Sequence, residues 1–328
     1  MSQDSAEAHF HPELFNLDSS AGAPPDFFSA DGQNWGFPTY NRTSMERDDY
    51  AWRKSRLRKM SRFFDAFRID HVLGFFRIWE IPAQYSSGLM GHFNPDLPYS
   101  REEIEALGLP LDTGLFLDDP RHPGMYVPII TADLSGLADW QKENFCRLHD
   151  DFFFHRHDEF WRVNAEKKIP ELLGATGMLA CAEDLGMVPD CVPGVMDHWK
   201  MLSLEMACME KGRPWPYLSV CATSSHDMST LRMQNAEAGR GDMSPEEVRS
   251  TLWAHLSSAS MLAIFPLQDW AALDAEVRRA AYDEERINQP ADPHHHWRFR
   301  FHRNLEEILR ADALNADIRA LLSASGRI

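Results

Sequence analysis

The chain has no apolar run of the length that a membrane-spanning helix requires. No segment of the 328 residues approaches the roughly 20 consecutive apolar residues that cross a bilayer. Residues 1 to 10 are polar and acidic, and they lack the basic and apolar regions of a secretory signal peptide. Internal repeats and low-complexity segments are also absent. We therefore expect a globular protein of the cytoplasm that has no membrane partner.

Cysteine is scarce and follows no pattern. The chain has five cysteines, an odd number, and none of them form a Cys-x-x-Cys pair. Cys181 and Cys221 lie inside apolar runs, where cysteine behaves as a small hydrophobic residue. This usage indicates a reducing compartment rather than a disulfide framework.

Positive charge is in deficit. The chain has 33 Lys and Arg against 50 Asp and Glu, which gives a formal charge of −17. Nucleic acids and anionic membranes require a basic face, so neither is an expected partner. A neutral sugar is compatible with this charge. The ten Trp, seven Tyr and twenty Phe fit the same idea because sugar rings stack on aromatic faces, although most of these side chains also suit a hydrophobic core.

The run of three histidines is a weak candidate for a metal site. His294, His295 and His296 are consecutive, and neighbouring residues on a helix point in different directions. No pattern of carboxylates or cysteines accompanies them, so they do not predict a metal site.

Three apolar, strand-like runs each end abruptly in charged residues. Residues 65 to 69 lead into Asp70, residues 178 to 182 lead into Glu183, and residues 218 to 222 lead towards Asp227. A buried strand that delivers a charged side chain to a site has this pattern. Strands also alternate with helices, which indicates a parallel α/β fold. Carboxylates at the C-terminal ends of several strands are typical of a (β/α)8 TIM barrel.

The number of predicted strands is too small for a whole barrel. We expect about five, which precede Asp70, Glu183 and Asp227 or lie near Leu204 and Phe265. Eight strands are needed for closure, so we expect only the C-terminal part of a barrel.

The chain divides into three predicted parts. Residues 1 to 82 hold a binding loop, a helix from about residue 45 to residue 64, and the strand before Asp70. The arginines and lysines of this helix, from Arg53 to Arg62, are interpreted as a solvated face. Residues 83 to 175 form an insertion that is mostly helical from residue 139 to residue 173, and residues 176 to 328 hold the later strands and helices. Ser244 and Glu247 predict a capping box at the start of a helix.

The three carboxylates suit retaining glycoside chemistry, which needs an ionised nucleophile and a protonated acid. Asp70 suits the nucleophile, because Arg68 lies two residues earlier on the same side of the strand and favours the charged form. Glu183 suits the acid/base because its longer side chain reaches the glycosidic oxygen. Asp227 with His226 suits a pair that grips ring hydroxyls as the transition state develops.

With these residues in place, the chain resembles the 4-α-glucanotransferases, the amylomaltase or disproportionating-enzyme family (glycoside hydrolase family 77) of the α-amylase clan. The long stretch before Glu183 is similar to that of the plant cytosolic-type subgroup and its bacterial relatives. The resemblance rests on five motifs, which are Gly22-Ala23-Pro24-Pro25-Asp26 with Gly32-Gln33-Asn34-Trp35-Gly36, Phe67-Arg68-Ile69-Asp70-His71, Ala182-Glu183-Asp184-Leu185-Gly186, Ser225-His226-Asp227, and Glu285-Arg286-Ile287-Asn288.

The resemblance implies roles for nine residues. Asp70 is implied to be the nucleophile, Glu183 the acid/base and Asp227 the stabiliser of the transition state. The implied substrate-binding residues are Arg68, His226, Asp26, Gln33, Trp35 and Asn288. The implied reaction transfers an α-1,4-glucan segment to the 4-hydroxyl of glucose or a glucan, without a metal or an organic cofactor.

Family members carry a long part before the Gly22–Asp26 motif, whereas this chain starts shortly before it. We therefore expect an N-terminally truncated member that is poorly soluble or inactive unless a complementary N-terminal piece is supplied. Two alternatives remain open. One is an α-glucan hydrolase, and the other is an inactive remnant or a glucan-binding fragment. The loop from Asp26 to Trp35 favours transfer over hydrolysis.

Overall fold

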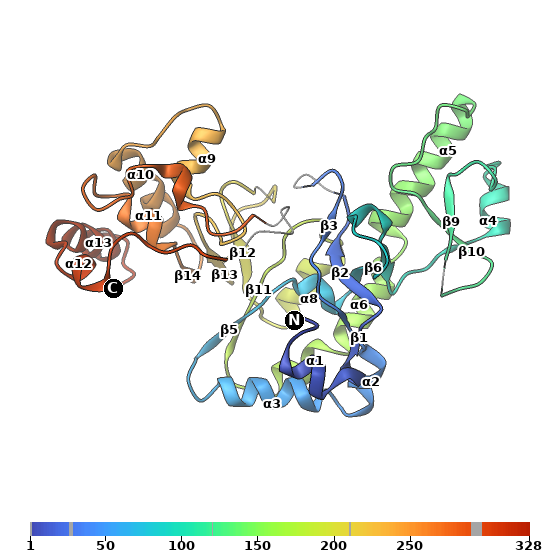
Figure 1. Ribbon diagram of the computed structural model, residues 1–328, viewed down its shortest axis with the longest axis horizontal. Helices are drawn as coiled ribbons and strands as arrows, with labels where there is room; N and C mark the ends of the chain where they lie inside the picture. The colour runs from blue at the N-terminus through green and yellow to red at the C-terminus, as the bar shows by residue number, and fades with distance from the viewer. Residues whose placement is uncertain (1, 26–28, 120, 210, 290–296) are drawn as a thin grey trace. The chain divides into compact units, whose positions relative to one another are not determined.

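The computed structural model describes residues 2–25, 29–119, 121–209, 211–289 and 297–328 (Figure 1). The chain falls into two units. Unit 1 comprises Met1–Ala180 and Asp184–Trp199, and unit 2 comprises Cys181–Glu183 and Lys200–Ile328. Asp70 therefore belongs to unit 1, whereas Glu183 and Asp227 belong to unit 2.

Unit 1 opens with short helices and a four-stranded antiparallel sheet. The helices are α1 (Ala6–Phe10) and η1 (Pro12–Leu14). The sheet has the order β3-β2-β6-β7 and consists of β2 (Ser19–Ala23), β3 (Gln33–Asn34), β6 (Ile78–Pro82) and β7 (His92–Asn94). A separate antiparallel pair joins β1 (Phe15–Asn16) to β4 (Thr39–Tyr40).

A close backbone approach holds β2 against β3. A Cβ atom at Gly22 would lie 2.0 Å from the carbonyl oxygen of Gln33, so only glycine fits there. Gly22 pairs with Asn34 and Ala23 with Gln33. The Gly22 motif therefore serves to place Gln33 and the residues that follow it.

The predicted helix over residues 45 to 64 is wrong in its bounds. The structure has two helices, α2 (Arg42–Arg47) and α3 (Ala51–Met60). Asp49 and Tyr50 adopt left-handed backbone angles, with φ of 56° and 54°, and this interrupts the helix. The basic residues of α3 are also not all solvated, because Lys54 is buried and pairs with Asp49 and Glu171.

The strand before Asp70 is present but is not buried as predicted. β5 (Ala66–Ile69) pairs with the start of β11 (Leu179–Ala182), where the Leu179 N–H donates to the Asp65 carbonyl over 2.8 Å. Ala66 and Arg68 are exposed. Among the described residues no other strand pairs with β5, which leaves its second edge uncovered by a sheet neighbour.

The stretch after β6 contains more strand than the sequence predicts. It includes η3 (Gly88–Met90), α4 (Arg101–Ala106), and an antiparallel sheet of β8 (Tyr99–Ser100), β10 (Met125–Pro128) and β9 (Phe116–Asp118), whereas η2 (Val72–Phe75) lies between β5 and β6. The predicted helical section over residues 139 to 173 is confirmed. It consists of α5 (Asp139–Asp150), the π-helical turn η4 (Asp151–His155), α6 (Asp158–Glu166) and α7 (Ile169–Leu173), and α8 (Cys191–His198) completes the unit.

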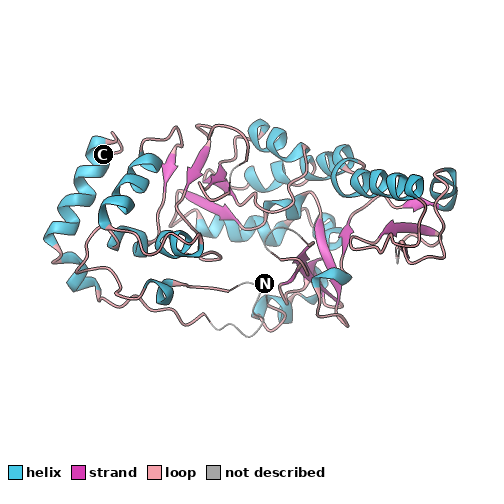
Figure 2. Cartoon of the chain, turned by 90° about the horizontal axis from the view of Figure 1, so that it is seen from above, coloured by secondary structure: helices cyan, strands magenta, loops and turns pink. Residues whose placement is uncertain are grey.

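Unit 2 is built on parallel strands. β12 (Ser203–Glu205), β13 (Ser219–Cys221) and β14 (Leu262–Ala263) pair in parallel, and Cys181 forms a parallel bridge with Leu202. Strands thus occur at all five predicted places. The helices, which Figure 2 distinguishes from the strands by colour, are α9 (Leu231–Glu237), α10 (Pro245–Leu256), α11 (Leu267–Ala271), η5 (Tyr282–Glu285), α12 (Leu305–Leu309) and α13 (Asp312–Ala324).

The predicted capping box of α10 is confirmed. The Glu247 N–H donates to Ser244 Oγ over 3.3 Å, and the Ser244 N–H donates to Glu247 Oε2 over 2.7 Å. The helix then packs Val248 and Leu252 into a core shared with Leu314 of α13 and Cys221 of β13. This packing supports the strand that precedes Asp227.

None of the described helices is both long and apolar enough to cross a bilayer. All five cysteines are free.

Candidate active site

Asp70 directly follows the last residue of β5. Arg68 Nη2 lies 2.8 Å from Asp70 Oδ1, which agrees with the prediction that both side chains lie on one side of the strand. The side chains are 39% and 77% exposed, so water screens the pair and its net stabilisation is small. The contact therefore orients the Asp70 carboxylate more than it stabilises the fold.

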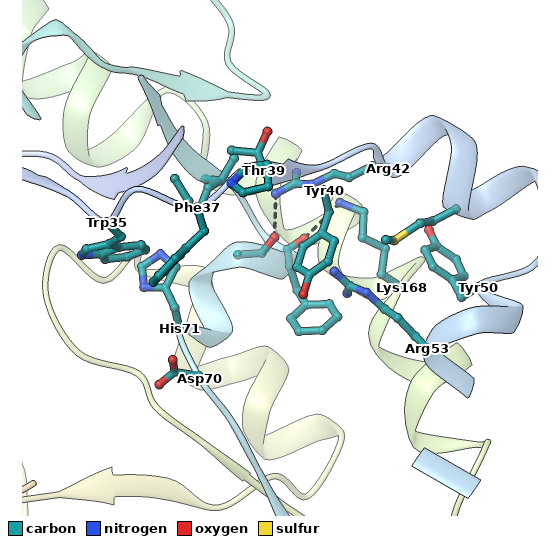
Figure 3. A pocket seen from close by; sticks show the side chains of 16 residues that line it. Trp35, Phe37, Thr39, Tyr40, Arg42, Tyr50, Arg53, Asp70, His71 and Lys168 are labelled. Atoms are coloured by element: carbon teal, nitrogen blue, oxygen red, sulfur yellow. Dashed lines mark hydrogen bonds between the residues drawn. The ribbon is translucent and has the colours of Figure 1, made fainter. Parts of the chain in front are cut away.

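A cavity of about 360 Å³ lies beside Asp70 in unit 1 (Figure 3). At the end near Asp70, Trp35 meets His71 edge to face, with ring centroids 4.9 Å apart. The cavity is lined by Ala21, Trp35, Phe37, Pro38, Thr39, Tyr40, Arg42, Met45, Tyr50, Arg53, Asp70, His71, Gly74, Phe75, Ile78 and Lys168. Of the predicted site residues, the structure thus brings Trp35 and Asp70 to one cavity.

Of the other two predicted residues of this loop, the structure describes Gln33 but not Asp26. Gln33 is held at this end of the cavity, because Trp35 Nε1 donates a hydrogen bond to Gln33 Oε1 over 2.9 Å. Asp26 lies outside the described residues, as do His294 to His296. The sequence did not single out His71 as a site residue. Burial and the charge of Arg77 lower the pKa of His71 to about 3, so its ring is neutral near pH 7.

In unit 2, Glu183 and Asp227 follow parallel strands. Glu183 comes directly after β11, and Asp227 lies in the turn after β13. Cys181 of β11 bridges Leu202 in parallel, and β12 pairs with β13 in parallel. Because parallel strands end at the same edge of a sheet, both carboxylates follow the C-terminal edge of unit 2, where catalytic groups of α/β proteins gather.

The structure brings together three predicted residues of unit 2. Asn288 Nδ2 donates to Asp227 Oδ1 over 2.9 Å, and His226 Nε2 lies 2.9 Å from Asp227 Oδ2. Trp297, which the sequence did not single out, places its ring 5.5 Å from that of His226 and is 62% exposed. An exposed aromatic face beside a carboxylate and an amide suits a sugar ring. In the sequence, the only feature that points to Trp297 as a binding residue is its position as a single Trp within a polar stretch.

A buried charge network supports Asn288. Arg286 Nε donates to the Asn288 carbonyl over 3.0 Å, and its Nη1 donates to Ser229 Oγ over 2.9 Å. The preceding residue, Glu285, accepts from the fully buried Arg232 over 2.6 Å, and Arg232 makes two further bonds of 2.7 Å to Asp242. Bidentate pairs of this kind are strong and directional, so they hold Asn288 towards Asp227.

A buried carboxyl beneath the turn that carries Asp227 predicts a pH dependence. Asp269 is fully buried, accepts bonds from Thr223 Oγ1 and the Leu231 N–H, and has its pKa raised by burial to about 6. Because the pKa of Asp269 is higher in the folded chain than in the unfolded chain, protonation of Asp269 favours the folded state. Its contribution to the free energy of unfolding is complete below about pH 4 and is lost as the pH rises through 6.

We expect the variant Asp269→Asn, which does not titrate, to lose this dependence. Its free energy of unfolding should gain about 3 kcal/mol relative to that of the parent protein between pH 4 and pH 7. Urea unfolding followed by tryptophan fluorescence at several pH values measures the difference. A difference that stays constant across this range would contradict the assignment.

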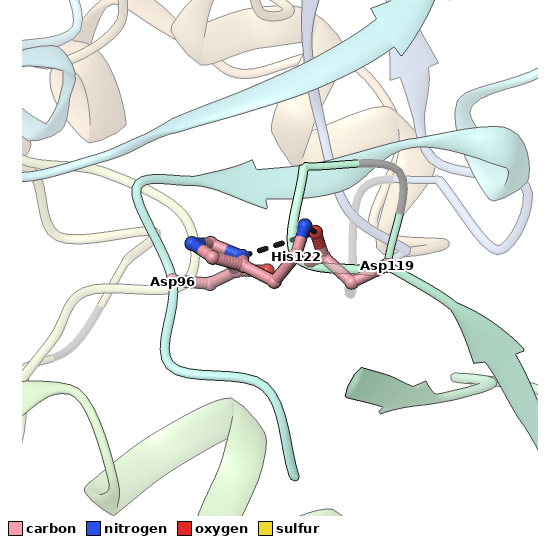
Figure 4. Close-up of side chains that lie close together, drawn as sticks. All are labelled: Asp96, Asp119 and His122. Carbon is pink, nitrogen blue, oxygen red and sulfur yellow. Dashed lines mark hydrogen bonds and ion pairs between the residues drawn. The ribbon is translucent and has the colours of Figure 1, made fainter. Parts of the chain in front are cut away.

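Asp96, Asp119 and His122 form the group of described residues that most resembles a metal site (Figure 4). Their potential ligand atoms lie within 4.8 Å of one another, and both aspartates are buried. However, Arg121 Nη2 lies 2.6 Å from Asp96 Oδ1 and 3.5 Å from Asp119 Oδ2. Because this guanidinium already supplies a cation to both carboxylates, we interpret the group as an ion-pair network.

We expect Arg121→Met to destabilise the protein at pH 8 by about 3–5 kcal/mol, because two buried carboxylates would lose their cation. Urea unfolding measures the change. The matched control is Arg101→Met, which removes an exposed pair with Glu105 and should cost less than about 1 kcal/mol. Equal effects of the two variants would refute the interpretation.

The chain is similar in sequence to proteins of known family. The sequence model of the 4-alpha-glucanotransferase family matches residues 1–306. The rice protein 4-alpha-glucanotransferase DPE2 (Oryza sativa subsp. japonica) is 32% identical over 99% of this chain and 46% of its own length. A 4-alpha-glucanotransferase of Chlamydia caviae is 25% identical over 98% of this chain and 54% of its own length.

Among solved structures, the amylomaltase from Streptococcus agalactiae in complex with acarbose is similar, with a TM-score of 0.64 and 19% identity. The match covers 99% of this chain and 55% of that one. The fold is thus that of an amylomaltase. The chain spans about half the length of the relatives that it matches.

Proposed function

This chain belongs to the 4-alpha-glucanotransferase family, and from that premise we propose that it transfers α-1,4-glucan segments to the 4-hydroxyl of glucose or of another glucan. Asp70 carries the proposal, because it follows a strand, is paired with Arg68 and lines a cavity with Trp35. A retaining transfer requires a nucleophilic carboxylate beside the anomeric carbon of the donor.

The proposed mechanism is a double displacement. The Asp70 carboxylate attacks the anomeric carbon of the donor, and Glu183 donates a proton to the leaving glycosidic oxygen. Glu183 then takes the proton from the acceptor 4-hydroxyl as that oxygen attacks the glycosyl–Asp70 ester. Asp227 binds ring hydroxyls and stabilises the oxocarbenium-like state, and Asn288 and His226 orient it.

The remaining substrate contacts are proposed from the same residues. Gln33, Trp35 and Asp26, the last of which lies outside the described residues, are proposed to bind the acceptor, and Arg68 and Trp297 are each proposed to contact the glucan. The proposed substrates are α-1,4-glucans and maltooligosaccharides, with glucose as an acceptor. A cytoplasmic location agrees with the five free cysteines.

The proposed architecture is the C-terminal part of a (β/α)8 barrel. Its parts are residues 1–82, an inserted subdomain over residues 83–175, and residues 176–328. The free edge of β5 within the described sheets and the exposed Phe63 and Phe64 support the idea that another polypeptide segment covers this face. We propose that activity requires such a complementary segment.

Incubation with maltotriose tests the function. Transfer yields glucose together with longer maltooligosaccharides, whereas hydrolysis yields only glucose and maltose. The chain is assayed alone and mixed with the N-terminal half of the rice relative. Robust transfer by the chain alone would overturn the need for a complement. Binding of acarbose without turnover of maltotriose, both alone and with the added half, would instead indicate a glucan-binding fragment.

A further inference from the structure

Three basic side chains line the cavity away from Asp70 (Figure 3). Arg42 comes from α2, Arg53 from α3, and Lys168 from the residue before α7. Lys168 is only 8% exposed, and Arg42 Nη1 is fully buried. The sequence interpretation of the basic helix face as solvated is therefore wrong for Arg53, which faces the cavity.

No carboxylate forms an ion pair with these three cations in the part of the chain that the structure describes. Arg42 Nη2 donates to the Gly74 carbonyl over 2.6 Å, while Arg42 Nη1 has no hydrogen-bond partner among the described residues. Lys168 Nζ donates to the Phe75 carbonyl over 3.1 Å. Arg53 lies over the Tyr40 ring, 4.2 Å from its centroid. The contacts of the three cations are thus with neutral groups.

The adjacent residue Lys54, in contrast, is paired with two carboxylates. Its Nζ lies 2.8 Å from Asp49 and 2.7 Å from Glu171. The acids that act on the cavity cations do so without direct contact. Glu80 attracts Arg42, but its carboxylate is bound to Thr39, Ser19 and Asn94. The exposed Glu46 attracts Lys168 from a distance.

The electrostatic consequence is a site that favours an anion. Burial and mutual repulsion lower the pKa of Lys168 to about 6 and that of Arg42 to about 10, and burial lowers the pKa of Arg53. Buried charge without a counter-charge is costly, and a bound anion offsets that cost. Two planar guanidinium groups, with a lysine amine that a bound anion would protonate, form a donor set that recognises a phosphate group.

The other end of the same cavity is suited to a sugar. Trp35 and Phe37 offer aromatic faces, and Asp70 offers a carboxylate for hydroxyl groups. The volume of about 360 Å³ lies at the lower end of the range for small-ligand sites and is large enough for a monosaccharide phosphate.

We propose that this cavity binds a phosphorylated sugar, with the phosphate monoester among Arg42, Arg53 and Lys168 and the sugar ring directed towards Trp35 and Asp70. The phosphate part of the inference follows from the uncompensated cations. The sugar part rests on the proposed function of Asp70.

Isothermal titration calorimetry of the full chain tests the proposal. The probes are glucose 6-phosphate, glucose and inorganic phosphate. Glucose 6-phosphate should bind at least about 10-fold more tightly than either of the others, because it uses both ends of the cavity. Equal affinity for inorganic phosphate and glucose 6-phosphate would overturn the sugar part, and no binding of either would overturn the whole proposal.

Variants identify the cations. Arg42→Gln and Arg53→Gln should each weaken glucose 6-phosphate binding about 10-fold or more, since each removes a charged hydrogen-bond donor. Arg53→Lys keeps the charge and should lose less than Arg53→Gln. The matched control is Arg56→Gln on the same helix. Arg56 pairs with Glu7, and neither residue lines the cavity, so this variant should leave binding unchanged. Unchanged binding in both Gln variants would contradict the proposal.

The number of protons taken up on binding gives a second test, which uses the parent protein and needs no variant. An anion beside Lys168 raises the lowered pKa of that group, so binding at pH 7 should take up protons. Titrations in two buffers of different ionisation enthalpy measure this uptake, and a titration with maltotriose should show none. No uptake with glucose 6-phosphate would contradict the role of Lys168.

Two further outcomes separate this inference from the function itself. If maltotriose is disproportionated but glucose 6-phosphate does not bind, the inference fails and the function stands. If glucose 6-phosphate binds but no transfer occurs even with the complementary segment present, the function fails and the anion site stands. If a complementary polypeptide abolishes glucose 6-phosphate binding when added, the cavity is closed to this ligand in the assembled protein, which would overturn the proposal.

Discussion

Replacement of Asp70 by alanine is expected to lower transfer from maltotriose on the order of 10⁴-fold or more, because no other group can form the glycosyl ester. Initial rates of oligosaccharide formation, measured with the complementary polypeptide present, quantify the loss. Asp65→Ala is the matched control. Asp65 is an exposed carboxylate at the other end of the same strand, and its removal should leave the rate unchanged.

A change of stereochemistry makes the Asp70 prediction sharper. In Asp70→Ala, azide fits the space of the missing carboxylate and attacks an α-maltosyl fluoride donor directly. A single displacement inverts the anomeric carbon, so the product should be a β-maltosyl azide. An α-azide, or full transfer activity in Asp70→Ala, would show that another residue is the nucleophile.

Glu183→Ala is expected to lower transfer from maltotriose by about 10²- to 10⁴-fold, the usual contribution of general acid–base catalysis. The loss should nearly vanish for the first step with α-maltosyl fluoride, since fluoride leaves without a proton. The maltosyl ester of Asp70 should then accumulate. Mass spectrometry of the intact chain and of the peptide that contains Asp70 detects it.

Azide also distinguishes Glu183 from Asp70. When azide attacks the accumulated ester in Glu183→Ala, the second displacement restores the configuration and gives an α-maltosyl azide. Glu246→Gln, an exposed carboxylate at the start of α10 in the same unit, is the control and should behave like the parent protein. An equal loss on maltotriose and on the fluoride would exclude Glu183 as the proton donor.

Local chemistry made part of the structure predictable. The period of two along a strand predicts that Arg68 and Asp70 share a side, and the 2.8 Å ion pair agrees. The spacing of Ser244 and Glu247 predicts the capping box that starts α10. The five strands were visible as apolar runs. All of these features depend on residues close together in the sequence.

Other features depend on distant segments and were missed or wrong. The apolar run before Asp70 predicts a buried strand, yet burial depends on which elements cover it, and Ala66 and Arg68 are exposed. The break at Tyr50 has no proline or glycine to signal it. The contact between Asp227 and Asn288 joins residues 61 positions apart, and only the resemblance to a family pointed to Asn288.

The sequence by itself determined the chemical inventory of this protein: three carboxylates that follow strands, a surplus of negative charge, and the motifs of a glucanotransferase. Only the tertiary structure decided which charges are compensated. Lys54 meets Glu171, 117 residues away, whereas Arg53, the adjacent residue, faces a cavity shared with Lys168. The physical reason is that solvation and ion pairing depend on what surrounds a charge in space, and neighbouring positions on one helix face different surroundings.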